Sequence, residues 1–360
     1  MLLKKIEQIY GYFVEKRNAE FDAGKLEVMT IEYPVISVGN VSAGGTGKSP
    51  FVQLVAREFL KHSIAPAIVS RGYRRKSRGE VVVCDGLQIL AGVEQAGDEL
   101  MMHAESLGVV VIANENKGSA AQKAVEIFKE RDDEARQRFT SKEDYALNTV
   151  PRCIIIDDGF QHRKIHRDLD IVLIDHATLQ NPFLLPRGRL REPLDSLKRA
   201  DVIVLMNGAQ RFTLKKHVQE NLLKENCVII EAQTVAGEFY DINSRQTFKI
   251  NPFRSGCVAI STIAQPERFI KTLEGREIEV HHHFAFKDHY WFSEGDIKKI
   301  IQKCELLQTN VIATTEKDAV KLRKFKDLFN SFKVSVAVLP IRIEISEGRD
   351  EFLKKLTEIF

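Results

Sequence analysis

Short runs of β-branched and aliphatic residues alternate with segments of helical periodicity in the N-terminal half of the chain. Such continuous apolar runs are typical of strands that are buried on both faces of a sheet. They predict strands at residues 35–38, 67–70, 81–84, 109–113, 153–157, 171–174 and 202–206. Helical patterns at residues 50–62 and 120–130 fill two of the gaps. The alternation predicts an α/β fold, with helices on both faces of a mostly parallel sheet.

A second, smaller series of α/β elements is predicted toward the C-terminus. It comprises strands at 257–261, 278–283, 311–314 and 334–338, and helices at 267–273, 294–305, 318–325 and 350–359. Residues 233–253 contain Gly, Asn, Asp and Pro and are interpreted as a connecting ribbon. We therefore predict two domains, at residues 1–235 and 250–360. The charged, weakly periodic segment 131–151 is interpreted as a surface insertion.

The first residues place apolar side chains on one face of a predicted helix, with basic residues between and beyond them. The apolar positions are Leu2, Leu3, Ile6, Ile9, Tyr10, Phe13 and Val14. The pattern fits a helix packed on the domain, or an interfacial helix whose apolar side enters lipid. It lacks the continuous apolar stretch and the cleavage site of a signal peptide.

Composition and charge exclude several classes of protein. Hydrophobic residues make up 44% of the chain and charged residues 29%, as in ordinary globular proteins. No apolar run is long enough to span a bilayer. The net charge of +3 is too small to indicate a nucleic acid partner, and we expect none. The five cysteines are scattered without a CxxC pair, which indicates reduced thiols in the cytosol.

A glycine-rich loop follows the first predicted strand, and residues 37–51 read SVGNVSAGGTGKSPF. Glycines between a strand and a helix let backbone N–H groups approach phosphates, while a lysine reaches the outer phosphates and a serine hydroxyl ligates Mg²⁺. The nucleotide-binding candidates are Ser42, Ala43, Gly44, Gly45, Thr46, Gly47, Lys48 and Ser49. The strict pattern has glycine where this chain has Ser42. We interpret the segment as a variant P-loop that binds ATP and Mg²⁺, in a P-loop NTPase-type domain.

Two aspartates end the predicted strand at 153–157. Asp157 and Asp158 follow an apolar run, which is the form of a Walker B element, and His162 lies just beyond them. Open α/β sheets bind ligands at the carboxyl ends of their strands. We therefore predict that this aspartate pair, together with the hydroxyl of Ser49, holds the metal.

Further short motifs follow one another in a specific order over residues 30–322. They read SRGYRRKSRG (70–79), GDE (97–99), DDGFQHRKIHRDLDIVLID (157–175), LLPRGRLREP (184–193), IAQPERF (263–269), KDHYWF (287–292) and TTEKDAVKL (314–322). This ordered set resembles the tetraacyldisaccharide 4'-kinase family. The resemblance implies transfer of the γ-phosphate of ATP to the 4'-hydroxyl of a tetraacyldisaccharide 1-phosphate, which forms the 1,4'-bisphosphate, lipid IVA, in lipid A biosynthesis.

The resemblance also implies roles for individual residues. Lys48 is expected to contact the outer phosphates, and Asp98 to activate the sugar hydroxyl with His289 as its partner. Glu99 and His162 are expected to be further polar residues of the site. An Asp–His pair is chemically suitable, because a sugar hydroxyl must lose its proton as the new P–O bond forms.

The resemblance places the enzyme peripherally on the cytoplasmic face of the bacterial inner membrane. The acylated substrate lies in a bilayer leaflet, so this location favours the interfacial interpretation of the helix from Leu2 to Val14. Two departures from the family pattern stand out. Tyr290 replaces a second histidine after His289, and Lys117 lies in the segment where the family often carries an arginine. Lys117 could replace that arginine, or the contact could be lost.

Two basic clusters and one histidine run are open to alternative interpretations. The clusters are Arg71, Arg74, Arg75, Lys76 and Arg78, and Arg187, Arg189 and Arg191. They suit a phosphorylated substrate, but they also suit solvated loops. His281, His282 and His283 are consecutive in a predicted strand. Because successive strand side chains point to opposite faces, the three cannot converge on one ion, and we predict no metal there.

Two other functions share the loop and the Walker B strand. One is a membrane-associated nucleotide switch without a chemical acceptor, which would not need Asp98 or His289. The other is a P-loop kinase for a soluble small molecule, which would remain active on a substrate without acyl chains.

Overall fold

The computed structural model describes residues 2–138 and 150–360. The larger of its two sheets consists of β1 (Val35–Asn40), β2 (Ala65–Ser70), β3 (Val81–Asp85), β4 (Val110–Ala113), β5 (Arg152–Asp157), β6 (Leu169–Asp175), β7 (Val202–Met206), β8 (Val228–Ala236) and β14 (Ile341–Glu347). Their spatial order is β14-β8-β7-β6-β1-β5-β2-β4-β3. The pairings from β8 to β4 are parallel, and the edge strands β14 and β3 are antiparallel. The predicted mostly parallel α/β sheet is therefore confirmed.

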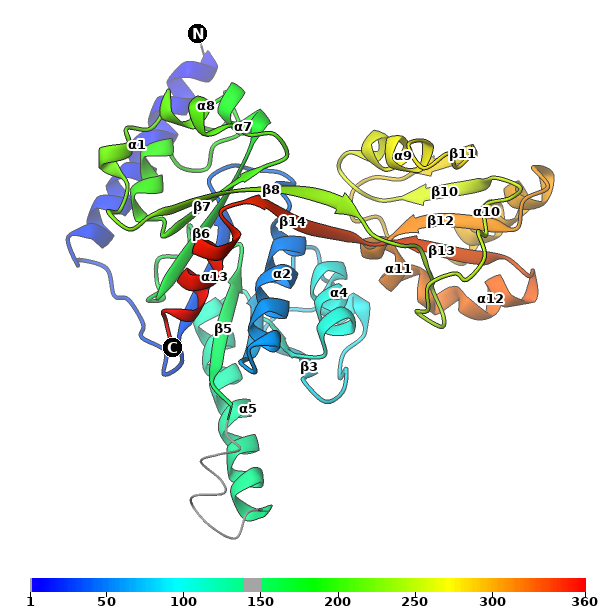
Figure 1. Cartoon of the computed structure of the whole chain (residues 1–360), viewed down its shortest axis with the longest axis horizontal. Helices are drawn as coiled ribbons and strands as arrows, with labels where there is room; N and C mark the ends of the chain where they lie inside the picture. Colours follow the sequence, from blue (N-terminus) through cyan, green and yellow to red (C-terminus); the bar gives the residue numbers. More distant parts are fainter. Residues whose placement is uncertain (1, 139–149) are drawn as a thin grey trace.

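Helices cover both faces of this sheet, as Figure 1 shows. They are α1 (Leu2–Asp22), α2 (Lys48–Lys61), α3 (Val93–Ala96), α4 (Asp98–Leu107), α5 (Lys117–Arg138), α7 (His176–Gln180), α8 (Arg211–Lys215) and α13 (Arg349–Thr357), with 3₁₀ turns η1 (Leu194–Arg199) and η2 (Glu220–Leu222). Ile36 and Val38 of β1 pack in one core with residues of α2, α4 and α13. Val35, whose side chain points to the opposite face, packs in a second core with residues of α5. The result is a three-layer α/β/α arrangement.

The smaller sheet has the order β11-β10-β12-β13-β9. Its strands are β9 (Tyr240–Asp241), β10 (Cys257–Ser261), β11 (Val280–Ala285), β12 (Val311–Thr315) and β13 (Ser335–Leu339). Its helices are α9 (Pro266–Glu274), α10 (Glu294–Leu306), α11 (Glu316–Leu322) and α12 (Lys326–Ser331), and η3 (Arg323–Phe325) joins the last two. The predicted strands and helices of this region are confirmed with small shifts of their ends.

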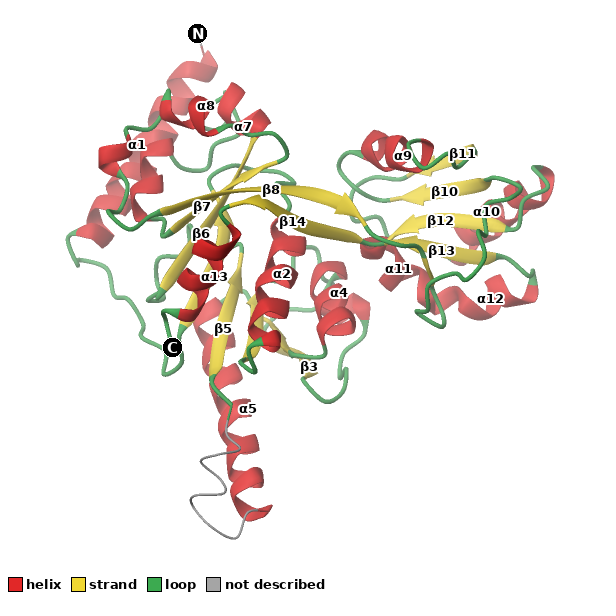
Figure 2. Ribbon diagram, in the orientation of Figure 1, coloured by secondary structure: helices red, strands yellow, loops and turns green. Residues whose placement is uncertain are grey.

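The connection between the sheets differs from the prediction. Residues 233–236, interpreted as ribbon, continue β8, and the chain returns along β14, which the sequence analysis missed. The two strands pair antiparallel and run side by side between the sheets in Figure 2. β14 alternates Ile341, Ile343 and Ile345 with polar residues, a pattern that predicts a half-exposed strand.

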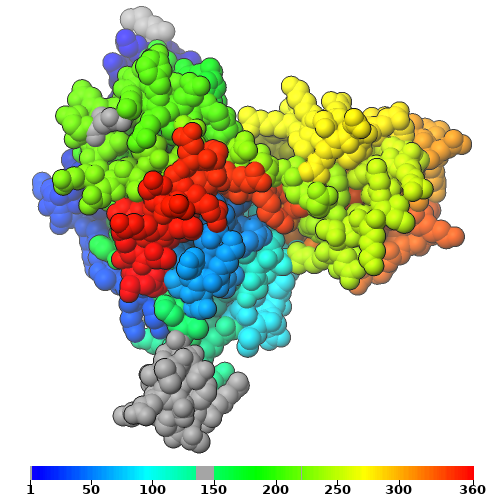
Figure 3. Space-filling view, viewed as in Figure 1, coloured from blue at the N-terminus to red at the C-terminus, as the bar shows by residue number. Residues whose placement is uncertain are grey.

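The C-terminal helix consequently lies on the larger sheet. In α13, Phe352 packs edge-to-face on Phe51 of α2 at 5.7 Å, and Arg349 donates a 3.0 Å hydrogen bond to Glu58. Figure 3 shows this red C-terminal segment lying against the blue segment around α2. We propose domain limits of 2–236 with 341–360 for the larger unit, and 240–339 for the smaller one, in place of the division at 235 and 250.

The predicted insertion at 131–151 is wrong in its first part. α5 continues through Arg138, so residues 131–138 are helical, and 139–149 lie outside the described residues. Residues 131–138 contain Glu, Arg and Gln, which are good helix formers, and no glycine or proline. A lack of apolar periodicity in this segment therefore does not mark the end of the helix.

Candidate active site

The glycine-rich loop connects central strand β1 to helix α2, as predicted. Gly44 and Gly47 have φ angles of 112° and 90°, a conformation that favours glycine, and α2 begins at Lys48. The Asn40 side-chain amide donates to Thr46 Oγ1 at 3.0 Å and holds the loop to the strand. Ser42 is fully buried and accepts a 2.9 Å hydrogen bond from the Thr178 hydroxyl. The departure at Ser42 therefore has a structural role in anchoring the loop.

Asp157 lies beside this loop, because β5 pairs in parallel with β1 and Asp157 is opposite Val38. Its Oδ1 atom is buried and has no hydrogen-bond partner among the described residues. Burial, with the charges of Glu99 and Asp158, raises the pKa of Asp157 to about 7. An unpartnered buried carboxylate oxygen next to a P-loop fits a divalent cation such as Mg²⁺.

The neighbouring Asp158 is in a contrasting environment. Its backbone is in the left-handed region, with φ of 52°. Arg191 Nη1 donates to both carboxylate oxygens at 2.9 and 3.1 Å, and Lys48 Nζ lies 3.4 Å from Oδ1. Burial would raise the pKa of Asp158, but the cationic Lys48, Arg191 and Lys117 lower it to about 2. The pair therefore combines one carboxylate in ion pairs with Arg191 and Lys48 and one whose buried Oδ1 has no hydrogen-bond partner among the described residues.

Lys117 binds the backbone of this aspartate pair. Its Nζ donates to the backbone carbonyls of Asp157 and Asp158 at 2.8 and 2.6 Å. The side chain is buried, and burial lowers its pKa. Lys117 thus holds the backbone at the carboxyl end of β5 through two hydrogen bonds. His162, at the same end of β5, has its pKa lowered to about 4 by burial and by nearby cations, so it is neutral at neutral pH.

The predicted Asp98 and His289 are in direct contact. His289 Nδ1 lies 2.9 and 3.0 Å from the two oxygens of Asp98, and both side chains are buried. Asp98 is the first residue of α4, whereas His289 lies in the loop before α10 with φ of 60°. Burial would raise the pKa of Asp98, but the hydrogen bond with His289 and the charges of Lys317 and Lys321 lower it. Asp98 is therefore a carboxylate.

Glu99 connects the two groups of residues. It follows Asp98 on α4, and its charge interacts with Lys48 on one side and with Lys317 and His289 on the other. Burial, the largest influence, raises the pKa of Glu99. The charge of Glu99 therefore acts on the side of the P-loop and the aspartate pair and also on the side of the Asp–His pair.

Comparison with known proteins agrees with this geometry. The sequence model of the tetraacyldisaccharide-1-P 4'-kinase family matches residues 1–359. The chain belongs to that family. A tetraacyldisaccharide 4'-kinase of Chlorobaculum parvum is 32% identical over 99% of this chain and 94% of its own length. One of Halothermothrix orenii is 33% identical over 96% of this chain and 88% of its own length.

A solved structure extends the similarity to three dimensions. The crystal structure of LpxK from Aquifex aeolicus in complex with ATP matches with a TM-score of 0.73 at 29% identity, and the match covers 99% of this chain and 98% of that one. The kinase family inferred from the ordered motifs and the α/β fold predicted from the alternation of strands and helices are therefore confirmed.

Sequence reasoning missed two lysines of this candidate site. Lys317 and Lys321 lie four residues apart on one face of α11, which packs against α4. Lys317 Nζ is 3.0 Å from His289 Nε2, and Lys321 Nζ is 3.5 Å from Asp98 Oδ2. Both lysines are in the TTEKDAVKL motif, but their spacing equally fits a solvated helix face.

The two basic clusters are mostly engaged with the protein itself. Arg75 is almost fully buried and pairs with Glu115 at 2.8 Å, and Arg74 donates to the carbonyl of Asp288. Arg189 donates from Nε to the carbonyl of Ala43 in the P-loop at 3.0 Å. The other members of the first cluster are exposed, but Lys76 pairs with Glu94 at 3.0 Å, which leaves Arg71 and Arg78. These are the cations best placed for a charged partner from outside.

The histidine run is a strand with separate contacts. His281 Nε2 meets the carbonyl of Ser255 at 2.8 Å, and His283 Nε2 meets Ser261 Oγ at 2.9 Å. His282 packs edge-to-face on Phe284 at 4.6 Å. Because each ring has its own partner, the run has a structural explanation in β11.

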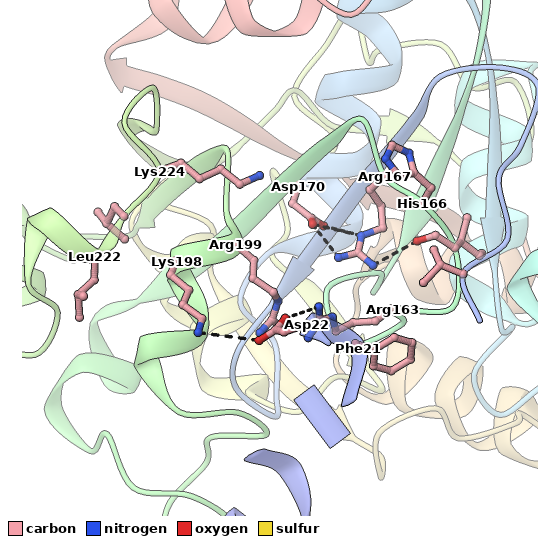
Figure 4. Close-up of a pocket in the computed structure, with 13 residues that line it drawn as sticks. Phe21, Asp22, Arg163, His166, Arg167, Asp170, Lys198, Arg199, Leu222 and Lys224 are labelled. Atoms are coloured by element: carbon pink, nitrogen blue, oxygen red, sulfur yellow. Dashed lines mark hydrogen bonds and ion pairs between the residues drawn. The ribbon is translucent and has the colours of Figure 1, made fainter. Parts of the chain in front are cut away.

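A separate surface pocket of about 580 Å³, drawn in Figure 4, lies near the amino ends of β6 and β7 in the larger sheet. It includes Asp170 at the start of β6 and Arg199 just before β7, whereas the P-loop is at the carboxyl ends of the strands. Its cations are already paired: Arg163 with Asp22 at 2.7 Å, and Arg167 with Asp170 at 2.9 Å. This pocket is therefore separate from the candidate active site.

Proposed function

We propose that this chain transfers the γ-phosphoryl group of ATP to the 4'-hydroxyl of a tetraacyldisaccharide 1-phosphate. The proposal rests above all on the buried contact between Asp98 and His289 beside a P-loop. A nucleotide switch needs no such pair, because it has no hydroxyl to deprotonate. Membership of the tetraacyldisaccharide-1-P 4'-kinase family supports the identity of the acceptor.

The reaction requires one bond to form and one to break. The 4'-oxygen bonds to the γ-phosphorus as the bond from that phosphorus to the β–γ bridging oxygen breaks, and ADP leaves. Asp98 accepts the hydroxyl proton, since its lowered pKa keeps it ionised. Lys48 and the loop N–H groups bind the phosphates and stabilise charge on the phosphoryl oxygens.

Mg²⁺ would be held by Ser49, Asp157 and Asp158, and when bound it neutralises negative charge on the phosphates. The unpartnered Oδ1 of Asp157 supports this assignment. Arg191 and Lys48 orient Asp158, so the protein contributes a pre-arranged second carboxylate.

The helix α1 supports access to a lipid substrate. Its apolar residues are exposed along one face: Leu2, Leu3, Ile6, Ile9, Tyr12 and Phe13. Tyr10 and Val14 instead face the protein, and the Tyr10 hydroxyl donates to the Arg191 carbonyl at 2.9 Å. We propose that the exposed face enters the leaflet that holds the substrate, with Lys4 and Lys5 at anionic headgroups.

This contact would be peripheral, at the cytoplasmic face of the bacterial inner membrane. In the part of the chain that the structure describes, no helix combines the length and the apolar character that a bilayer span requires.

The direct test is transfer of labelled γ-phosphate from ATP to a purified tetraacyldisaccharide 1-phosphate in mixed micelles with Mg²⁺. A lipid-free reaction and the Lys48→Ala variant are the controls. Label in the lipid that disappears with Lys48→Ala is the expected result. ATP hydrolysis without labelled lipid would favour the switch, and equal labelling of a deacylated disaccharide would favour a kinase for soluble substrates.

A further inference from the structure

Helix α1 has two faces with different surroundings. The residues of its middle turns that are at least partly buried recur at helical spacing: Glu7, Tyr10, Gly11, Val14, Arg17 and Asn18. The other residues of the helix as far as Lys16 are exposed, among them the apolar positions that are proposed to enter lipid. One face of α1 is therefore available to the rest of the protein, while the other remains free for a membrane.

The partly buried face of α1 contacts residues 184–192, which we call the connecting segment. The Glu7 carboxylate accepts a 3.1 Å hydrogen bond from the Leu184 backbone N–H. One turn further along the helix, the Tyr10 hydroxyl donates to the Arg191 carbonyl at 2.9 Å. The helix is therefore hydrogen-bonded to the backbone of this segment at two places.

A buried carboxylate fixes the end of the connecting segment. Glu192 is fully buried, and its two oxygens accept hydrogen bonds from Arg17 at 3.2 Å and from Asn18 at 3.0 Å. Arg199 also pairs with Glu192 at 2.6 Å. Because a buried carboxylate that lost such partners would be costly, α1 and the connecting segment stay together in the folded protein.

The connecting segment also contacts the P-loop. The Arg189 carbonyl accepts a 2.7 Å hydrogen bond from the Ala43 N–H, and Arg189 Nε donates back to the Ala43 carbonyl at 3.0 Å. The Arg191 backbone N–H donates to the Val41 carbonyl at 2.7 Å. The segment is therefore bound to α1 on one side and to the nucleotide-binding loop on the other.

Arg191 joins these two sets of contacts in a single residue. Its carbonyl accepts from Tyr10, and its backbone N–H donates to Val41. Its side chain reaches Asp158, where Nη1 donates to both carboxylate oxygens at 2.9 and 3.1 Å. A line of direct contacts therefore runs from α1 through Arg191 to one of the two aspartates assigned to Mg²⁺.

We propose that Tyr10 is a positioning residue for the nucleotide site: it fixes the Arg191 backbone and so places the guanidinium that orients Asp158 toward Mg²⁺–ATP. The inference deepens the proposed function and rests on its assignment of Asp158 to the metal. Helix α1 then has two separate tasks, one at the lipid surface and one at the nucleotide site, and different faces of the helix carry them.

The expected effect is specific to the metal complex of ATP. Without the Tyr10 hydroxyl, the Arg191 carbonyl loses a hydrogen bond, and the guanidinium is less well fixed beside Asp158. ATP without a cation gains nothing from Asp158, because phosphates and a carboxylate repel each other. Looser packing of α1 by itself would instead affect ATP binding equally with and without Mg²⁺.

The test is calorimetric ATP binding by the full chain without lipid, once with saturating Mg²⁺ and once with EDTA. Tyr10→Phe should weaken ATP binding by about 3- to 10-fold with Mg²⁺, the range expected for one hydrogen bond, and leave binding in EDTA unchanged. Tyr33→Phe, which removes the hydroxyl of another partly buried tyrosine just before β1, is the matched control. It should leave both affinities unchanged.

A double-mutant cycle shows whether the effect passes through Arg191. Arg191→Met removes the guanidinium and should itself weaken binding of Mg²⁺–ATP. Tyr10→Phe should add nothing in the Arg191→Met background, because the two substitutions interrupt the same line of contacts.

Two results would overturn the inference. One is a Tyr10→Phe protein that binds Mg²⁺–ATP as tightly as the wild type. The other is a pair of additive effects in the cycle, which would mean that Tyr10 acts by another route. Absence of Mg²⁺-dependent ATP binding in the wild type would overturn the proposed function as well, whereas normal binding by both the wild type and Tyr10→Phe would overturn this inference alone.

Discussion

The nucleotide side and the acceptor side of the proposed active site are built in opposite ways. On the nucleotide side, the Asn40–Thr46 hydrogen bond joins residues six positions apart, and one strand–loop–helix segment supplies the whole P-loop. On the acceptor side, Asp98 and His289 are 191 positions apart and come from different units. Phosphate binding needs successive backbone N–H groups, which one turn of chain can supply, whereas proton transfer needs side chains that only the tertiary fold brings together.

Electrostatics also separate the two sides. Asp157 has no hydrogen-bond partner for one buried oxygen among the described residues, and its pKa is raised, which suits a site completed by a cation. Asp98 has its partners within the protein, and its pKa is lowered, which suits a base that is ready at neutral pH. The difference predicts that substitutions on the two sides affect binding and turnover separately.

The largest expected effect is on the acceptor side. Asp98→Asn should reduce kcat by about 10²- to 10⁴-fold, the usual contribution of a general base, because the amide cannot accept the hydroxyl proton. ATP affinity measured by calorimetry should remain close to that of the wild type. Asp327→Asn, an exposed aspartate in the first turn of α12, is the matched control. A collapse of ATP affinity in Asp98→Asn would place this residue in the nucleotide site instead.

The next effect is on the nucleotide side. Lys48→Ala should reduce phosphoryl transfer by about 10²- to 10³-fold, because a cation that stabilises charge on the phosphoryl oxygens is lost. In contrast to Asp98→Asn, it should also weaken ATP binding in the same calorimetric experiment. Lys61→Ala, an exposed lysine at the end of α2, is the control. Normal ATP affinity in Lys48→Ala would remove the distinction between the two sides.

The pH dependence of metal binding gives a third test. Asp157 holds a proton below about pH 7 in the folded protein, and Mg²⁺ must displace it. Mg²⁺ affinity should therefore rise by up to about tenfold per pH unit below pH 7 and level off above it. Magnesium titrations of ATP binding at several pH values measure this slope. It should be lost in Asp157→Asn but kept in Asp158→Asn, whose pKa is already low; a slope that persists in Asp157→Asn would contradict the assignment.

Asp157 should also influence the stability of the metal-free protein. A carboxyl whose pKa is raised on folding contributes stability that is present below its unfolded pKa of about 3.9 and lost as the pH rises through about 7. Asp157→Asn removes that loss. Its thermal unfolding temperature should therefore exceed that of the wild type at about pH 8 without metal, and an equal or lower temperature would contradict a buried, proton-binding Asp157.

The smallest expected effect is at the lipid surface. The double substitution Ile9→Glu with Phe13→Glu should reduce sedimentation with anionic vesicles by about three- to tenfold, because partial burial of two apolar side chains is lost. Activity toward a short-chain substrate in detergent should change little. Leu87→Glu, which alters a residue that is 84% exposed in the turn after β3, is the control. Unchanged sedimentation of the double variant would indicate that α1 serves only to pack on the domain.

What the sequence by itself determined was local: the parallel strands, the P-loop and the aspartates at the end of β5 follow from periodicity and from backbone chemistry over a few residues. Asp98 and His289 were identified through the family resemblance, because nothing in their own segments distinguishes them from a helix start and a turn. The tertiary structure alone decided that β14 and α13 return to the larger sheet, that Lys317 reaches His289, and that Arg191 holds Asp158. These outcomes depend on which distant surfaces pack together, and local patterns of hydrophobicity do not encode that choice.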